Sequence, residues 1–376
     1  MYVHSLAAHV HLQERQRVHG DVEGRLRLPR RPNGCVPGSL QTFIVATVLG
    51  ALGCGPELIL PPEGSLLREP LQGLPERFSE VGLYPAAPDL DAVPSIAILY
   101  EPAWPLWSNG SAKRRYIVVP AGETIDNTLM PWRFPAGTLL FKTFLYSDPA
   151  LAAGLRPVET RIMRFGAEGE WDYATYRWRE DASEADLVDP WKPDPVPVSS
   201  TGADFVHTIP ATLECRTCHE SREGEVLGFE PLQLGASLES GGTQLDQLSE
   251  RGLFAADPAA PERIEHEDPT TRAVLGHFYG DCVHCHNGGD GPSSSFDLRP
   301  AVALENTVGV MSSSSASAFG VRIIPGDPGG SILFQSTSGE TPDSEVKLMP
   351  PLGVDVRNSE TIELLRGWIV ELGDEE

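Results

Sequence analysis

Short extended runs rich in apolar residues fill the middle of the chain and predict β-strands. Glycine or proline separates successive runs, as in the turns of an antiparallel sheet. The run at residues 171–178 is dense in aromatic and β-branched side chains, which suit a half-buried strand. The clearest strands are predicted at residues 115–119, 138–146, 159–165 and 171–178. This pattern predicts a β-rich domain over residues 77–210.

After residue 270 the apolar positions follow a helical period instead. Residues 270–279 and 359–372 predict amphipathic helices, and residues 331–335 predict a shorter helix between them. Ser359 suits the N-cap of the last helix, and Gly373 suits its C-cap. The expected fold class is therefore α+β, in which a β-rich domain is followed by a segment at residues 211–269 that carries the first of two cysteine motifs described below, and by an all-α module at residues 270–376.

An apolar run near the N-terminus predicts export. Arg30 and Arg31 precede the apolar residues 43–52, and Cys54 follows them. This order is typical of a bacterial lipoprotein signal, although a buried segment of the mature fold is the alternative. The run is too short to span a bilayer, which takes about 18–20 apolar residues. We therefore expect a lipoprotein-type signal in residues 1–54 with lipidation at Cys54, a linker at residues 55–76, and a lipid-anchored protein in the periplasm or cell envelope.

Acidic residues outnumber basic ones by 53 to 29 in this chain of 376 residues, so the formal net charge is −24. Nucleic-acid phosphates would be repelled, which excludes nucleic acid as the expected partner. A basic protein partner fits better, and the alternative is that the acidic surface only keeps the protein soluble.

Two cysteine motifs carry the clearest chemistry. Cys215 and Cys218 are followed directly by His219, and Cys282 and Cys285 are followed by His286 in the same spacing. The spacing is the attachment signature of haem c, in which two thiols on one helical turn form thioethers and the histidine becomes the proximal iron ligand. We therefore predict two covalently bound haem c groups, with residues 211–269 as the first haem c segment.

Zinc binding and a disulfide or redox-active thiol pair remain alternatives for the same cysteines. Zinc sites built from paired cysteines commonly separate the pairs by about 15–20 residues. Here 63 residues lie between Cys218 and Cys282, and a histidine follows each pair, so the haem interpretation is favoured.

The remaining iron ligands are predicted from position. Met349 precedes two prolines and the last predicted helix, so we assign it as the distal ligand of the second haem. For the first haem we take His207 as the candidate distal ligand, because it lies eight residues before Cys215. His284, inside the second motif, is expected to face solvent. Further candidates for the first iron are Met130, Met163, His266 and His277.

Taken together, these motifs resemble an exported bacterial family of dihaem c-type cytochromes that is largely uncharacterised. In that family the helical module is a class I cytochrome c domain, in which Gly276 would let the first and last helices cross closely. The residues that carry the resemblance, besides the two cysteine motifs, are Trp107-Ser108 with Gly110, Lys113 and Arg115; Lys142-Thr-Phe144; Glu159-Thr-Arg161; Tyr176 and Trp178; His207-Thr-Ile-Pro210; Pro325-Gly-Asp-Pro328; and Met349-Pro-Pro-Leu-Gly353.

The resemblance implies a periplasmic protein that passes single electrons between redox partners, and it identifies no substrate. Two other functions remain open: the electron-accepting subunit of a dehydrogenase, and a dihaem peroxidase-like enzyme with one open iron site. A lipoprotein whose haems are only structural is a further alternative.

Overall fold

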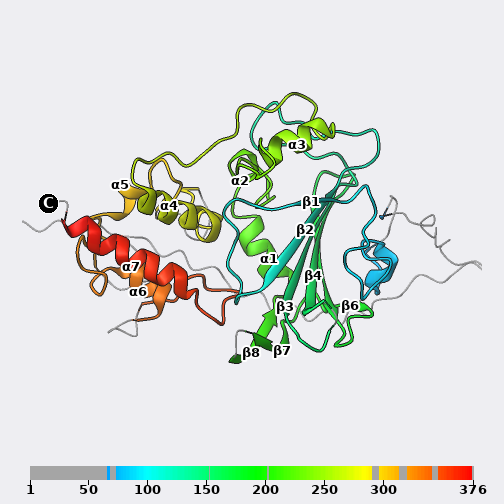
Figure 1. Ribbon diagram of the computed structural model, residues 1–376, viewed down its shortest axis with the longest axis horizontal. Helices are drawn as coiled ribbons and strands as arrows, with labels where there is room; N and C mark the ends of the chain where they lie inside the picture. Colours follow the sequence, from blue (N-terminus) through cyan, green and yellow to red (C-terminus); the bar gives the residue numbers. More distant parts are fainter. Residues whose placement is uncertain are drawn as a thin grey trace, which may run out of the picture. The chain divides into compact units, whose positions relative to one another are not determined.

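The computed structural model describes residues 66–67, 73–151, 153–200, 203–289, 296–312, 320–340 and 346–374 (Figure 1). The chain divides into two compact units, Met1–Glu57 and Leu58–Glu376, and all the described residues belong to the second. The predicted lipoprotein signal and Cys54 lie outside the described residues.

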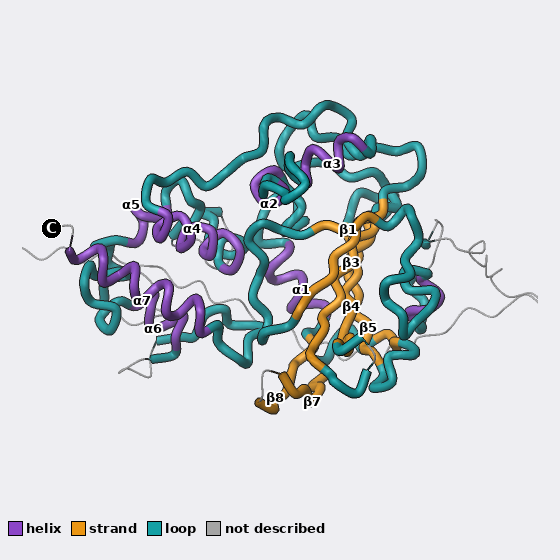
Figure 2. The backbone as a smooth tube through the Cα atoms, viewed as in Figure 1, coloured by secondary structure: helices purple, strands orange, loops and turns teal. Residues whose placement is uncertain are grey.

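A six-stranded antiparallel sheet is the main element of the fold, with each strand beside its neighbour in sequence (Figures 1 and 2). The four predicted strands are confirmed as β2 to β5 of this sheet. Two further strands, β7 (Asp194–Ser200) and β8 (Ala203–Ile209), pair as a separate hairpin. The six strands are β1 (Ile98–Tyr100), β2 (Ala112–Val118), β3 (Leu139–Ser147), β4 (Leu155–Phe165), β5 (Trp171–Trp178) and β6 (Ala185–Leu187).

Both faces of the sheet are covered, because alternate residues of each strand belong to different cores. On one face Tyr116 and Phe141 pack with Phe78 from the short helix η1 (Phe78–Val81). On the other face Ile117, Leu140 and Met163 pack with residues that follow the first cysteine motif. That second cover includes α2 (Pro231–Leu234) and α3 (Gln244–Glu250). The first motif is thereby held against one particular sheet face.

The helices after residue 268 pack around a third core. They are α4 (Pro269–Asp281), α5 (Ala303–Thr307), α6 (Ile332–Ser338) and α7 (Ser359–Asp374). Phe278 of α4 meets Trp368 of α7 edge to face, with ring centroids 6.4 Å apart, and the Trp368 indole N–H donates to the Thr271 hydroxyl. Among the described residues, none of the helices combines the length and apolarity needed to cross a bilayer.

The predicted fold class is wrong in its C-terminal part, because residues 270–376 do not form an all-α cytochrome module. The structure is mainly sheet with a few short helices, 23% helical in total. The helices are joined by stretches that make β-bridges, such as Val308 with Ile323. Their core is also completed by upstream residues, since Trp104 and Leu232 pack against it. Periodicity identified the helices but could not show that their core depends on residues far earlier in the chain.

The role expected for Gly276 is also different. A Cβ at this position would lie 2.3 Å from ring atoms of Trp104, so the glycine makes room for that indole rather than for α7. A Cβ at Gly280, one turn later, would lie 2.7 Å from the Trp104 carbonyl oxygen. The backbone of Trp104 is in turn held by Gln233, which accepts its N–H at 2.9 Å. The loop between β1 and β2 is therefore fastened directly to α4.

Gly276→Ala is expected to destabilise the protein by about 1–3 kcal/mol, because the added methyl must displace a packed indole. Urea unfolding followed by circular dichroism measures the change. Gly367→Ala is the matched control, since Gly367 is an exposed glycine inside α7 and a Cβ there would have no neighbouring atom within 4 Å. At that position the better helix propensity of alanine should stabilise by about 0.5–1 kcal/mol. Equal effects at both positions would contradict the packing described for Trp104.

Candidate cofactor site

The first cysteine motif forms the single short helix α1 (Thr212–His219). Glu214 closes its first turn by accepting the backbone N–H of Ala211 at 2.8 Å. Residues three and four apart share a helix face, so Cys215, Cys218 and His219 point to one side of α1. The helix packs on β5, where the His219 ring lies 5.4 Å from the ring of Tyr173.

The second motif begins where α4 ends. The backbone N–H groups of Cys285 and His286 both donate to the Cys282 carbonyl, at 3.0 and 2.9 Å, so the motif is a tight turn. The Asn287 side chain then donates to the carbonyl of Ser221, at 3.1 Å. This hydrogen bond joins the segments that follow the two motifs, 66 residues apart in sequence.

The two motifs meet at a cluster of three side chains. Ligand atoms of Cys218, His284 and Cys285 all lie within 4.8 Å of one another. His284 is buried, with 9% of its surface exposed, so the expectation that it faces solvent is wrong. A hydrogen bond with the Cys218 thiol lowers the pKa of Cys285 to about 7. The same hydrogen bond raises the pKa of Cys218, and burial of Cys218 adds to that increase. The pair therefore favours one thiolate, carried by Cys285.

A cavity opens beside this cluster, between the helices and one face of the sheet. Its empty space is about 1510 Å³, a figure that includes volume open to solvent. All three motif residues of α1 line it, as do His284 and Cys285. Of the second motif's described residues, Cys282 and His286 do not line this cavity, and Cys282 packs against the core between α4 and α7.

His219 is oriented as an iron ligand would need to be. Its Nδ1 lies 2.7 Å from the Glu225 carbonyl oxygen, which can only accept, so Nδ1 carries the proton and Nε2 is left as the basic nitrogen. Metal-binding histidines are commonly held by such a second hydrogen bond. Burial, together with the nearby cations Lys142 and Arg161, lowers the pKa of His219 to about 4 despite that hydrogen bond. The imidazole is therefore neutral near pH 7, as metal binding requires.

The loop after Met349 forms another wall of the cavity, through Pro350, Pro351, Leu352, Gly353 and Val354. Met349 itself is half-buried at the start of this stretch, and Arg357 donates to its carbonyl at 2.7 Å. The loop is tied to the sheet by Asn109, whose Oδ1 accepts the backbone N–H groups of Asp355 and Val356 at 2.6 and 2.9 Å.

Asn109 was missed as a site residue by sequence reasoning. It is buried, with 2% exposed, and its φ of 52° lies in the left-handed region, which asparagine tolerates better than most residues. The Trp107 indole N–H donates to the Val356 carbonyl and fastens the same loop from the other side. The Asn-Gly pair at 109–110 is a turn signal, but its partner 246 residues later could not be inferred from it.

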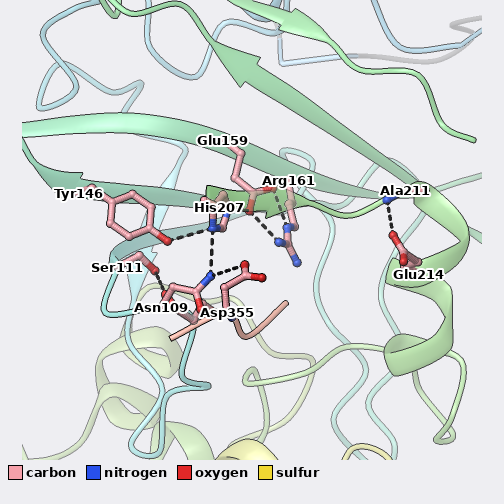
Figure 3. A network of polar contacts seen from close by, with 10 residues as sticks. Asn109, Ser111, Tyr146, Glu159, Arg161, His207, Ala211, Glu214 and Asp355 are labelled. Carbon is pink, nitrogen blue, oxygen red and sulfur yellow. Dashed lines mark hydrogen bonds and ion pairs between the residues drawn. The ribbon is translucent and has the colours of Figure 1, made fainter. Parts of the chain in front are cut away.

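His207 lies in a buried network on the sheet rather than in the cavity (Figure 3). Its Nε2 lies 2.9 Å from the Glu159 carboxylate, and its Nδ1 lies 3.0 Å from the Tyr146 hydroxyl. Both ring nitrogens are thus engaged by protein groups. We therefore leave His207 out of the proposed ligand set for the first iron.

Among the other candidates for the first iron, Met163 of β4 is the one that lines the cavity. Met130 is 54% exposed on the surface. His266 accepts the Asp268 N–H, and His277 contacts Asp281 and Thr361. Met163 is therefore the one of these four candidates that shares the cavity with His219.

No protein-family model matches the chain, and comparison with curated proteins and with solved structures likewise finds no match. The resemblance to dihaem cytochromes is therefore carried by the residues and motifs of the sequence, and the site must be argued from its own geometry.

Proposed function

We propose that this protein is a c-type cytochrome with two covalently attached haems, and that it carries single electrons between redox partners. The observation that carries the proposal is that the first cysteine motif and part of the second, His284 and Cys285, line one cavity. If each motif were a separate zinc site or disulfide, the two would not need to line the same cavity.

The residues present suit haem c at the first motif. Cys215 and Cys218 would form the thioethers, and His219 would hold the iron through its Nε2. A bound haem supplies an iron that alternates between its ferrous and ferric states. The protein's own part is to exclude water with apolar walls, among them Trp104, Leu140 and Met163. The polarity of these walls and the charges near them would set the reduction potential.

The second attachment site rests more on its motif than on the cavity. Cys285 lines the shared space, whereas Cys282 is packed into the core beside α4. His286 lies at the turn, with its ring 4.5 Å from that of Phe296. We keep Cys282 and Cys285 as attachment residues and His286 as proximal ligand of the second haem.

The test is a haem count on protein matured by a c-type haem attachment system. Intact mass under denaturing conditions and the pyridine haemochrome spectrum together give the number of covalent haems. Two haems per chain would support the proposal. A chain that matures without covalent haem, under conditions that attach haem to a known c-type cytochrome, would refute it.

Met349→Ala is expected to lower the reduction potential of one haem and to remove its Met–Fe absorption band. The physical reason is that a histidine–methionine ligand pair raises the potential of haem iron. Spectroelectrochemical titration measures both changes. Met311→Ala is the control, because Met311 is 57% exposed and does not line the cavity. An unchanged spectrum in Met349→Ala would remove Met349 from the ligand set.

A second candidate function is favoured by one observation, the cluster of Cys218, His284 and Cys285. Sulfur and imidazole are the donors that structural zinc sites use, and the cluster supplies three of the four such sites need. Metal analysis of the exported protein distinguishes the two functions. One zinc per chain without covalent haem would favour the zinc site.

A further inference from the structure

The cavity is lined by a row of three basic side chains that the haem attachment residues do not explain. Arg115 of β2 lies directly opposite Lys142 of β3, and Lys142 lies directly opposite Arg161 of β4. Directly opposed residues of neighbouring strands have Cβ atoms about 4.5–5.5 Å apart, and like charges there are destabilising. All three residues line the cavity.

Arg161 of this row is paired with a protein carboxylate, whereas Arg115 and Lys142 are not. Glu159, in the next row on the same face, binds Arg161 at 2.7 Å and also accepts from His207. Lys142 lies over the Phe144 ring at 4.8 Å, and burial, together with the neighbouring cations Arg115 and Arg161, holds its pKa well below the usual range for lysine. Arg115 is buried, since only 6% of its surface is exposed, and its guanidinium makes no hydrogen bond to any described residue. An arginine in this state is suited to receive an anion.

A further basic residue lies near the row. Lys113 is on the same face and donates to the Ser111 carbonyl, and burial lowers its pKa to about 7 although Asp281 opposes the shift. Glu101 lies near Arg115 but is exposed. The carboxylates that line the cavity are already used, Glu230 by Arg222 and Glu214 by the Ala211 N–H. Such a cationic concentration stands out in a chain with a net charge of −24.

We propose that Arg115, Lys142 and Arg161 bind the propionate carboxylates of the haem attached at the first motif. This inference rests on the proposed function. Its geometric basis is that the row lines the same cavity as Cys215, Cys218 and His219. Arginine pairs with carboxylates through two parallel hydrogen bonds, which is the geometry that the buried Arg115 guanidinium can offer.

The same chemistry has a second source, the carboxylate of a separate small molecule that enters the cavity. The propionate source is favoured because a haem held covalently on α1 would bring two carboxylates into this space permanently. Permanent counter-charges are what a buried row of like charges requires. A transient carboxylate would leave the repulsion in place whenever it departed.

The test uses the matured full-length protein and the variants Arg115→Gln and Lys142→Gln. In both, the resonance Raman band of propionate bending should shift, and the reduction potential of one haem should fall, because a cation that favours the reduced state is lost. Arg114→Gln is the matched control. Arg114 is the neighbouring residue of β2, where the alternation of side chains turns it to the other face, and it binds the Leu90 carbonyl and Asp91.

Each outcome distinguishes the inference from the function on which it rests. If covalent haem is present and both variants match Arg114→Gln in band position and potential, the inference is wrong and the proposed function stands. If succinate shifts the wild-type spectrum saturably and Arg115→Gln abolishes that response without moving the propionate band, the carboxylate belongs to a separate molecule and the propionate assignment is overturned. Absence of covalent haem in the wild type removes both proposals.

Discussion

Replacing Cys215 and Cys218 together with alanine is expected to remove one covalent haem and leave the other. Thioether formation needs the thiols themselves, so the loss at this site should be complete rather than partial. The measurement is the intact mass of the denatured, exported protein, compared with the wild type. The haem that remains should be the one attached at Cys282 and Cys285.

The reciprocal variant, Cys282→Ala with Cys285→Ala, is the matched control for attachment. It should retain the haem at α1, although Cys282 also packs in the core between α4 and α7 and its loss will lower stability. Comparison of the two spectra assigns each haem to its motif. A first-motif variant that still carries two covalent haems would show that Cys215 and Cys218 are not attachment residues.

Glu159→Ala is expected to destabilise the protein by about 3–5 kcal/mol, the usual cost of removing one partner of a buried ion pair. Glu159 is completely buried and holds Arg161 through both carboxylate oxygens, at 2.7 and 3.0 Å. Its loss would leave Arg161 beside Lys142 with no opposing carboxylate, and would leave His207 without the acceptor for its Nε2–H. Urea unfolding at neutral pH measures the difference.

Asp172→Ala is the control for that measurement. Asp172 binds Arg164 of the same β4 strand at 2.7 Å, but its side chain is 54% exposed, so its pair should contribute only about 0–1 kcal/mol. A loss at Glu159 no larger than the loss at Asp172 would contradict the burial and pairing described for the network.

The same carboxylate predicts how stability depends on pH. Burial opposes ionisation of Glu159, but Arg161 and the hydrogen bond from His207 outweigh it and lower the pKa to about 2. The folded state therefore binds fewer protons than the unfolded state between about pH 4.5 and pH 2. The stabilisation is complete above this window and is lost as the pH falls through it. The acid limb of the stability curve should therefore be shallower in Glu159→Ala than in the wild type.

The sequence was a good guide to elements whose pattern is local. Apolar runs bounded by turn residues predicted β2 to β5, because each strand buries both faces in different cores, and helical periodicity predicted α4, α6 and α7. The predicted caps of α7 were wrong. Asn358, not Ser359, caps its start by accepting the N–H groups of Glu360 and Thr361, and the helix continues past Gly373 to Asp374. The predicted domain type failed because no local pattern states that Trp104 completes a core made by helices some 170 residues later.

The candidate site shows the same division. The cysteine motifs could be found from their spacing, but their meeting at Cys218 and Cys285 depends on the tertiary fold. Arg115, Lys142 and Arg161 were visible only as parts of separate motifs, because strand register decides that they form one row. His207 was chosen for its nearness to Cys215 in sequence, whereas β8 carries it into a hydrogen-bonded network on the sheet.

Because Trp104 packs against Gly276 and Gly280, the C-terminal half of the chain depends on the N-terminal half for its packing. Trp104 and Gln233, which accepts the Trp104 N–H, are both synthesised before α4. Trp104 is therefore already present when α4 folds. A fragment that begins after the sheet would carry both glycines but nothing to fill the groove they form. The half of the chain that carries the cysteine motifs is therefore not an independent domain. If recombination moved it alone into another protein, the surface of α4 that Trp104 covers would be left unpacked.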